Sequence, residues 1–329
     1  MTLLAESVIR VAHGVILGGH NGTVLPSDPA APAHRAGAAL RAVPAPLLFI
    51  GSGMSTYVGA GFAVALFALM PPTTVAWWRL IIGALILLAW RRPWRRRWTR
   101  HELAIAALFG VAMSTMNVIF YAAISHRSLG TAVSLEFLGP VAVALVTGRG
   151  WRPRVAAGLA LAGVGAISGF GLDLSDPSQR LGMILALGAG SAWAAYILLG
   201  RRVAGSGGVD SLAVASAIGA IVYLPLAATT ASAALGQTRS LLLVLGVGVM
   251  STVIPYALDQ INMGRLTSDA FALLSSLMPA TSLVVGVVML RQMPNVWEVL
   301  GLVLVSAAVA LAGSGGGSRR PARIPAAGE

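Results

Sequence analysis

The stretch VSLEFLGPVAVAL, residues 133–145, places one carboxylate, Glu136, among residues that are otherwise apolar, small or proline. Such a run is typical of a membrane-spanning helix, where an ionised side chain costs about 2.5–3.5 kcal/mol at the bilayer centre. Ionisable residues at that depth therefore face a partner or an aqueous cavity, and they usually mark a functional site. The stretch thus indicates a membrane protein with a polar site in its interior.

The composition of the whole chain supports this interpretation. Of its 329 residues, 57% are hydrophobic and only 10% are charged, whereas a soluble domain carries about 25% charged residues. Apolar runs of about 20 residues, long enough to cross a bilayer as a helix, alternate with short polar loops. The sequence predicts an all-α polytopic protein that has the lipid bilayer as its solvent.

Two tails enclose the predicted membrane region. Residues 1–45 and 314–329 are rich in Pro, Ala and Gly, have no helical pattern of apolar residues, and are expected to be flexible. Ten membrane-spanning helices are predicted between them. Their expected ranges are 46–69, 72–90, 103–125, 128–147, 153–171, 180–200, 211–230, 240–260, 269–290 and 296–313.

Arginine sets the expected orientation of these helices. The chain has 23 basic residues, all of them arginine, and a net charge of +12. With the N-terminus in the cytoplasm, most arginines fall on the cytoplasmic side, as the positive-inside rule requires, including the run RRPWRRRWTR at 91–100. Both termini are therefore predicted to be cytoplasmic, and the positive charge is not expected to bind nucleic acid. Four arginines fall on the outer side: Arg127, Arg180, Arg239 and Arg291.

The predicted helices divide into two halves of five, residues 46–171 and 180–313. The fourth helix of each half has an early proline, Pro140 or Pro279, and is followed by a short loop and a helix rich in Gly and Ala. Because each half has an odd number of helices, the second half enters the membrane in the opposite orientation. Inverted repeats are typical of secondary transporters, whose substrate sites lie near the midplane between the repeats.

With these features the chain resembles the EamA-type drug/metabolite transporter superfamily, and within it the threonine/homoserine exporter family. The motifs that carry the resemblance are SLEFLGPVAVAL (134–145), LALGAGSAWAAYIL (185–198) and STVIPYALD (251–259). The resemblance implies a ten-helix carrier in the bacterial cytoplasmic membrane. It also implies export of small amino acids, driven by the proton gradient.

Glu136 is the main candidate for substrate binding or proton coupling. It lies near the middle of its predicted helix, and small neighbours one turn away leave room beside its carboxylate. Pro140 has no N–H, so the backbone carbonyl of Glu136 loses its donor within the helix. Together the two groups offer acceptors to an ammonium group or a proton. The alternative is a protonated structural residue.

Arg79 lies about two turns into the predicted helix 72–90. Its planar fork could bind a substrate carboxylate or Glu136. Alternatively, it could extend to the outer interface beside Trp77 and Trp78, which would form an aromatic belt there.

Two further pairs of side chains could line a substrate site. Asn117 and Tyr121 lie four residues apart on one face of a predicted helix, and Trp193 and Tyr196 lie three apart on another. An amide and aromatic rings suit a zwitterionic substrate, whose cation can rest on a ring. The alternative is ordinary packing and hydrogen bonding between helices.

Asp259 is a further candidate, at the predicted cytoplasmic end of a helix. Nearness to water would also explain its charge. Pro255, four residues earlier, frees the backbone carbonyl of Ser251 and is expected to kink its helix, as are Pro140 and Pro279. Such kinks could serve alternating access or only shape the bundle.

No cofactor or metal is expected. The five histidines lie in predicted tails and loops, and none shares a helix face with a second ligand. The stretch GSGGGS at 313–318 lacks the Lys-Ser/Thr of a phosphate-binding loop, so ATP-driven transport is not expected.

The sequence thus predicts a secondary transporter for small amino acids, with protons as the coupling ion. The related family usually has Glu before its second-half proline, where this chain has Met278, and this keeps open an efflux carrier for a drug or another small metabolite. The remote alternative is an intramembrane enzyme or lipid-handling protein. An intramembrane hydrolase would need a second Asp, a Ser–His pair or a His-metal set at membrane depth, and apart from Glu136 and Arg79 no ionisable residue is predicted so deep, so an enzyme is not expected. Association into a homodimer is left open.

Overall fold

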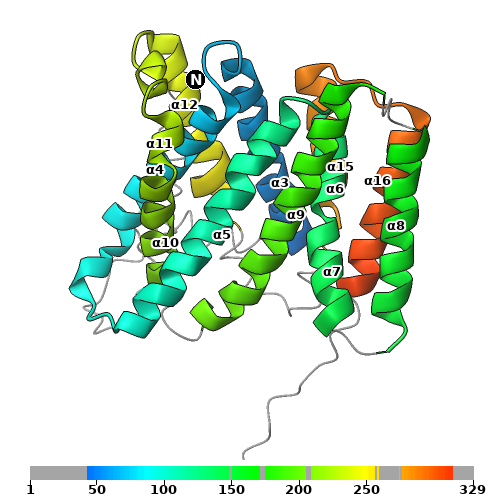
Figure 1. Ribbon diagram of the computed structural model, residues 1–329, viewed down its shortest axis with the longest axis horizontal. Coiled ribbons are helices and arrows are strands. Elements are labelled where there is room, and N and C mark those ends of the chain that lie inside the picture. Colours follow the sequence, from blue (N-terminus) through cyan, green and yellow to red (C-terminus); the bar gives the residue numbers. More distant parts are fainter. Residues whose placement is uncertain are drawn as a thin grey trace, which may run out of the picture.

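The computed structural model describes residues 43–147, 150–170, 175–204, 209–255 and 276–313, together with residues 258 and 274. Within these ranges the chain is helical and has no strand, so the predicted all-α class is confirmed for them (Figure 1). The predicted C-terminal tail, nearly all of the N-terminal tail and Asp259 lie outside the described residues.

The helices of the first half follow the predicted ranges closely. One predicted helix, 128–147, is divided into two at Phe137. The elements are α3 (Ala45–Leu66), α4 (Pro72–Arg91), the short η1 (Pro93–Arg95), α5 (Arg100–Ile124), α6 (Leu129–Glu136), α7 (Leu138–Thr147) and α8 (Arg152–Phe170).

In the second half the predicted helix 211–230 ends earlier than expected, because Pro225 interrupts it and only a short helix follows. The elements are α9 (Pro177–Ala204), α10 (Val209–Val222), α11 (Leu224–Ala227), η2 (Ala231–Ala234), α12 (Thr238–Gly248), the π-helix η3 (Val249–Val253), α15 (Met278–Leu290) and α16 (Val296–Gly313).

Helix starts follow local chemistry. Pro44 and Pro71 precede α3 and α4, and each holds an extended backbone that leads into the first helical turn. The side chain of Thr99 accepts a hydrogen bond from the backbone of Glu102, and the Glu102 side chain accepts one from the backbone of Thr99. This capping box starts α5 at Arg100, three residues before the predicted start.

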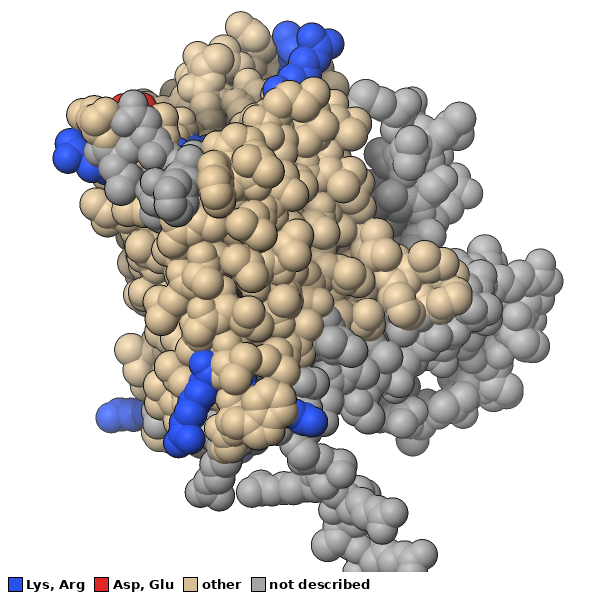
Figure 2. Space-filling model, turned by 90° about the vertical axis from the view of Figure 1, so that its right-hand side faces the viewer, with Lys and Arg blue, Asp and Glu red and all other residues tan. Residues whose placement is uncertain are grey.

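Four helices are long and apolar enough to cross a membrane: Pro46–Leu66, Pro72–Ala89, Arg100–Ile124 and Pro177–Leu199. Shorter apolar helices accompany them, at Leu129–Val143, Asp210–Val222, Thr238–Val253, Met278–Leu290 and Val296–Leu311. Figure 2 shows one face of the molecule, on which the described residues of the central band are uncharged and arginines lie at both ends. That distribution suits a bilayer around the middle of the bundle.

Helices that are far apart in the sequence lie side by side. α5 packs against α9, α4 against α10, and α8 against α16, while α3 contacts both α12 and α15 (Figure 1). In the α8–α16 pair, a Cβ added to Gly163 would lie 2.8 Å from the carbonyl oxygen of Gly301, and one added to Gly301 would lie 2.6 Å from that of Gly163. Glycine is needed at both positions because the two backbones touch, which is typical of helix packing in membranes.

Candidate functional site

The break between α6 and α7 falls directly after Glu136. The backbone N–H of Phe137 still donates to the carbonyl of Val133 at 3.0 Å, and the next helix begins at Leu138. Pro140 lies four residues after Glu136 and has no N–H to donate to the Glu136 carbonyl. A helix interruption was predicted from this proline, and the structure places it three residues before Pro140.

Glycines allow α9 to pass against this break. A Cβ added to Gly139 would lie 2.0 Å from the carbonyl oxygen of Gly190, and one added to Gly190 would lie 2.7 Å from that of Glu136. The freed carbonyl of Glu136 therefore lies against the backbone of α9. The carboxylate, and not this carbonyl, is the group of Glu136 that is left for a ligand.

Glu136 is buried, with 8% of its surface exposed. Among the described residues its carboxylate makes no hydrogen bond and no ion pair. The charged group that acts on it electrostatically is Arg79 on α4. A carboxylate that is buried without a hydrogen-bonded partner destabilises the fold. Glu136 is therefore better explained by a functional role than by a contribution to stability.

Arg79 points into the bundle. Its Nη2 donates to the backbone carbonyl of Ser251 at 3.0 Å, and its Cζ lies 5.7 Å from the ring centre of Tyr121. Of the two placements that the sequence allows, the structure has the inward one and not the one beside Trp77 and Trp78. Those two indoles donate to backbone carbonyls of other helices instead.

The proline that follows the π-helix η3 explains why Arg79 finds an acceptor. Pro255 has no N–H for the carbonyl of Ser251, so this oxygen lacks the donor of a regular α-helix, and it accepts from the guanidinium. The same segment is tied to α3 by two reciprocal bonds, from Ser55 Oγ to the Met250 carbonyl at 2.7 Å and from Ser251 Oγ to the Thr56 carbonyl at 3.0 Å. π-helices often occur at functional sites.

Sequence reasoning missed Tyr57 and Ser55, and it predicted the free carbonyl of Ser251 but not its partner Arg79. Tyr57 on α3 is 4% exposed, and Glu136 and Arg79 both act on it electrostatically. In the sequence it is one polar residue of an apolar helix, and no motif distinguishes it. For Ser251 a signal existed, because Pro255 four residues later marks its carbonyl as free.

The other predicted residues are only partly brought together. Tyr121 is fully buried beside Arg79, and its hydroxyl has no partner among the described residues. Asn117 donates to the carbonyl of Met113 on its own helix at 2.8 Å. The ring of Trp193 meets the ring of Phe137 edge to face at 4.6 Å, which places this indole next to the break.

Tyr196 does not join this group. Its ring stacks on Phe109 at 4.7 Å, in a second apolar cluster that also contains Met113 and Leu212. The main cluster contains Tyr57, Tyr121 and Phe137 instead. The predicted substrate face of α9 is therefore divided between two parts of the bundle.

Pro279 lies near the start of a described helix. It is the second residue of α15, where a proline is tolerated because the first turn needs no N–H donors. The part of the predicted helix 269–290 that precedes it lies largely outside the described residues, so the predicted kink stays a prediction.

Comparison with known proteins supports a transport role for this arrangement. The EamA-like transporter family matches residues 180–314. The threonine/homoserine exporter RhtA of Salmonella typhimurium (strain LT2) is 38% identical over 264 residues, which cover 80% of this chain and 89% of that protein. RhtA of Escherichia coli (strain K12) is 37% identical over 250 residues, which cover 76% of this chain and 84% of that one.

A solved crystal structure has a similar fold. It superimposes with a TM-score of 0.55 at 19% identity, over 81% of this chain and 96% of the other chain. At this identity the likeness concerns the fold alone, whereas the two exporters match across most of the sequence. The chain therefore belongs to the EamA-like transporter family, and it is a multi-pass membrane transporter and not an enzyme.

Proposed function

We propose that the protein exports threonine, homoserine or similar small amino acids across the bacterial cytoplasmic membrane by alternating access. The cargo is inferred from the RhtA exporters, which are 37–38% identical to this chain. The observation that carries the mechanism is the buried carboxylate of Glu136, which lacks a hydrogen bond among the described residues and lies in the electrostatic range of Arg79.

The two groups suit the two ends of an amino acid. The fork of Arg79 bonds to a neutral backbone carbonyl, so its charge is not matched by a hydrogen-bonded carboxylate. A substrate carboxylate could take up the remaining donors. The substrate ammonium, or a proton in its absence, would then bind Glu136, while the rings of Tyr57 and Tyr121 close the sides.

We also propose that ten helices form two inverted repeats, residues 46–171 and 180–313, between flexible tails. If α3 corresponds to α9, α5 to α12 and α6–α7 to α15, the observed contacts of α3 with α12 and α15 correspond to those of α9 with α5 and α6–α7. α4 would correspond to α10 and α8 to α16, so exchanging the two repeats leaves the observed contacts α4–α10 and α8–α16 unchanged. Rocking of one repeat against the other would expose Glu136 to each side in turn.

Proton coupling at Glu136 and cytoplasmic termini complete the proposal. The orientation follows from the positive-inside rule, with the arginine-rich loop 91–100 in the cytoplasm. All groups of the site come from one chain, so transport does not require the homodimer that the sequence leaves open.

Counterflow of radiolabelled threonine and homoserine in proteoliposomes tests the proposal. Wild-type protein should show saturable exchange that the Glu136→Gln variant loses. Glu102→Gln is the matched control, because Glu102 lies at a helix start on the surface, where glutamine can still serve the capping box.

Each outcome is informative. Exchange that survives in Glu136→Gln would keep the cargo and make Glu136 structural. If folded wild-type protein exchanged neither amino acid, the amino-acid cargo would be wrong, and an efflux carrier for a drug or another metabolite would take its place.

A further inference from the structure

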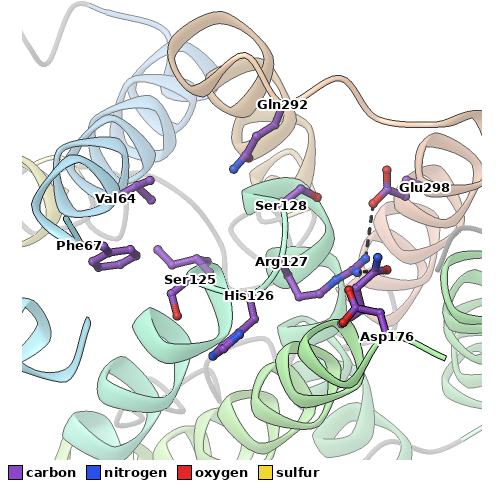
Figure 3. A pocket seen from close by; sticks show the side chains of 11 residues that line it. Val64, Phe67, Ser125, His126, Arg127, Ser128, Asp176, Gln292 and Glu298 are labelled. Atoms are coloured by element: carbon purple, nitrogen blue, oxygen red, sulfur yellow. Dashed lines mark hydrogen bonds and ion pairs between the residues drawn. The ribbon is translucent and has the colours of Figure 1, made fainter. Parts of the chain in front are cut away.

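A pocket of about 580 Å³ lies at the end of the bundle where α5 ends and where α6, α9 and α16 begin (Figure 3). It is separate from the Glu136 site, and in the proposed orientation it opens to the outside of the cell. Its polar lining includes Arg127, Asp176, Gln179 and Glu298, and Phe67 of the α3 end contributes an apolar wall. Figure 3 shows Arg127 directed toward Glu298 and Asp176.

Arg127 is buried in this lining, but not all of its hydrogen-bond donors have a partner among the described residues. Its side chain is 6% exposed, and its Nη1 donates to Gln179 Oε1 at 2.8 Å. The nearest carboxylate oxygen, on Glu298, is 3.6 Å from Nη2, and Nε has no partner among the described residues. Burial lowers the pKa of the Arg127 guanidinium, while Glu298 and Asp176 act in the opposite direction. A buried guanidinium with a spare donor favours an added anion.

The two carboxylates of the pocket are held in place by helix starts. Glu298 accepts hydrogen bonds from Thr131 Oγ1 at 2.7 Å and from the backbone of Asn295 at 3.0 Å. Asp176 accepts one from the backbone of Ser178 at 2.9 Å, at the start of α9. A carboxylate has about four acceptor positions, so both can still receive an ammonium group.

Backbone charge adds to this pattern. The N-termini of α6, α9 and α16 all lie at the pocket, and each carries a partial positive charge. Together with Arg127 they favour an anion, while Asp176 and Glu298, which lie beside Arg127 (Figure 3), favour a cation. The pocket therefore matches a group that carries both charges at a short distance.

A column of rings connects the pocket to the Glu136 site. Phe67 lines the pocket, and its ring meets the ring of Tyr121 edge to face at 6.5 Å. The guanidinium of Arg79 also lies beside Tyr121, at 5.7 Å from its ring centre. The two rings thus stand between the outer pocket and the charged groups of the interior.

We propose that this pocket is a second binding site for the zwitterionic head of an amino acid, with Arg127 for the carboxylate and Glu298 and Asp176 for the ammonium. The inference rests on the proposed function, because the pocket would bind exported cargo transiently after it has passed Tyr121 and Phe67. It is nevertheless testable without any transport.

The chain has no cysteine, so a single cysteine can be labelled on the natural background. Ser125→Cys places a near-isosteric thiol at an exposed position of the pocket lining. A membrane-impermeant maleimide should label it in right-side-out vesicles, and external L-threonine should slow the labelling. At a threonine concentration ten times its Kd, occupancy should slow the reaction about tenfold. Ser232→Cys, exposed in η2 and outside the pocket, is the matched control and should show no protection.

Two double variants test whether the protection by threonine depends on Arg127. Adding Arg127→Gln to Ser125→Cys should abolish protection, whereas adding Arg180→Gln, an exposed arginine in the first turn of α9, should preserve it. Protection should also persist with Glu136→Gln, because that change disables only the interior site. If threonine protected the cysteine but wild-type protein showed no counterflow, the pocket would still be a binding site and the proposed function would be refuted.

Three results would overturn the inference. They are the absence of protection by threonine in labelled Ser125→Cys, protection that survives Arg127→Gln, and protection that disappears with Glu136→Gln. Threoninol, which lacks the carboxylate, should protect far less than threonine. Equal protection by both would contradict the role assigned to Arg127.

Discussion

The α6–α7 break and the π-helix η3 start from the same backbone defect. In each, a proline removes the N–H that would bond a carbonyl four residues earlier: Pro140 does this for Glu136, and Pro255 for Ser251. At η3 the carbonyl accepts a hydrogen bond from Arg79 at 3.0 Å. At the other break the helix restarts at Leu138 and the carbonyl packs against Gly190.

The difference concerns which charged side chain the fold itself uses. Arg79 holds a structural bond, so it contributes to the stability of the α3–α4–η3 junction as well as to any substrate site. Glu136 has no hydrogen bond among the described residues that its loss would break. Removing the arginine should therefore damage both fold and transport, whereas neutralising the glutamate should damage transport alone.

The largest effect is expected where backbones touch at the α6–α7 break. Gly139→Ala would place a methyl group 2.0 Å from the carbonyl oxygen of Gly190, and backbone on both sides cannot yield easily. We expect the free energy of unfolding to fall by about 1–3 kcal/mol or more, which would appear as a lower Tm of the purified protein. Gly158→Ala on α8, which meets nothing within 4 Å, is the control. Equal Tm values for the two variants would show that the contact is looser than described.

The next largest effect is the difference between substitutions at Arg79 and at Glu136. Arg79→Ala should lose transport and also stability, by about 1–3 kcal/mol, because the Ser251 carbonyl becomes a buried acceptor without a donor. Glu136→Gln should lose transport at unchanged or raised Tm. Thermal unfolding and counterflow on the same preparations measure both. A stable Arg79→Ala variant would mean that the carbonyl finds another donor.

The two prolines allow the direct comparison. Pro140→Ala returns an N–H toward the Glu136 carbonyl, favours a continuous α6–α7 helix and should reduce the exchange rate several-fold. Pro255→Ala should change exchange less, since the Ser251 carbonyl is already bonded to Arg79. Initial rates of threonine counterflow check the order. The reverse order would place the functional flexibility in η3.

The smallest effect is expected for Tyr121→Phe. The hydroxyl of Tyr121 is buried and unpaired among the described residues, so its loss should leave Tm unchanged or raise it slightly. If the cargo supplies the missing partner, KM for threonine should rise while kcat is retained. An unchanged KM would make Tyr121 a packing residue only.

Local chemistry made part of this site predictable. Glu136 is noticeable as a carboxylate in an apolar run, and Pro140 and Pro255 mark the two freed carbonyls without any structural knowledge. The partner of the second carbonyl was not predictable, because Arg79 lies 172 residues away from Ser251. Gly190 and Tyr57 were missed for the same reason, since their roles depend on contacts between distant helices.

Helical spacing alone also misplaced Tyr196. A separation of three residues puts Trp193 and Tyr196 on one face, but it also moves the second ring about 4.5 Å along the axis. That shift is enough for Trp193 to meet Phe137 while Tyr196 stacks on Phe109. The outer pocket was likewise hidden, because its charged groups come from the starts of helices that are far apart in the sequence.

The polar bonds between α3, α4 and η3 have an evolutionary consequence. The bonds donated by Ser55, Arg79 and Ser251 end on the backbone carbonyls of Met250, Ser251 and Thr56. A backbone carbonyl is present whatever side chain its residue carries, so selection can replace Met250 or Thr56 without breaking the junction. Substitutions at these two positions can therefore accumulate one at a time while the scaffold around the charged groups persists.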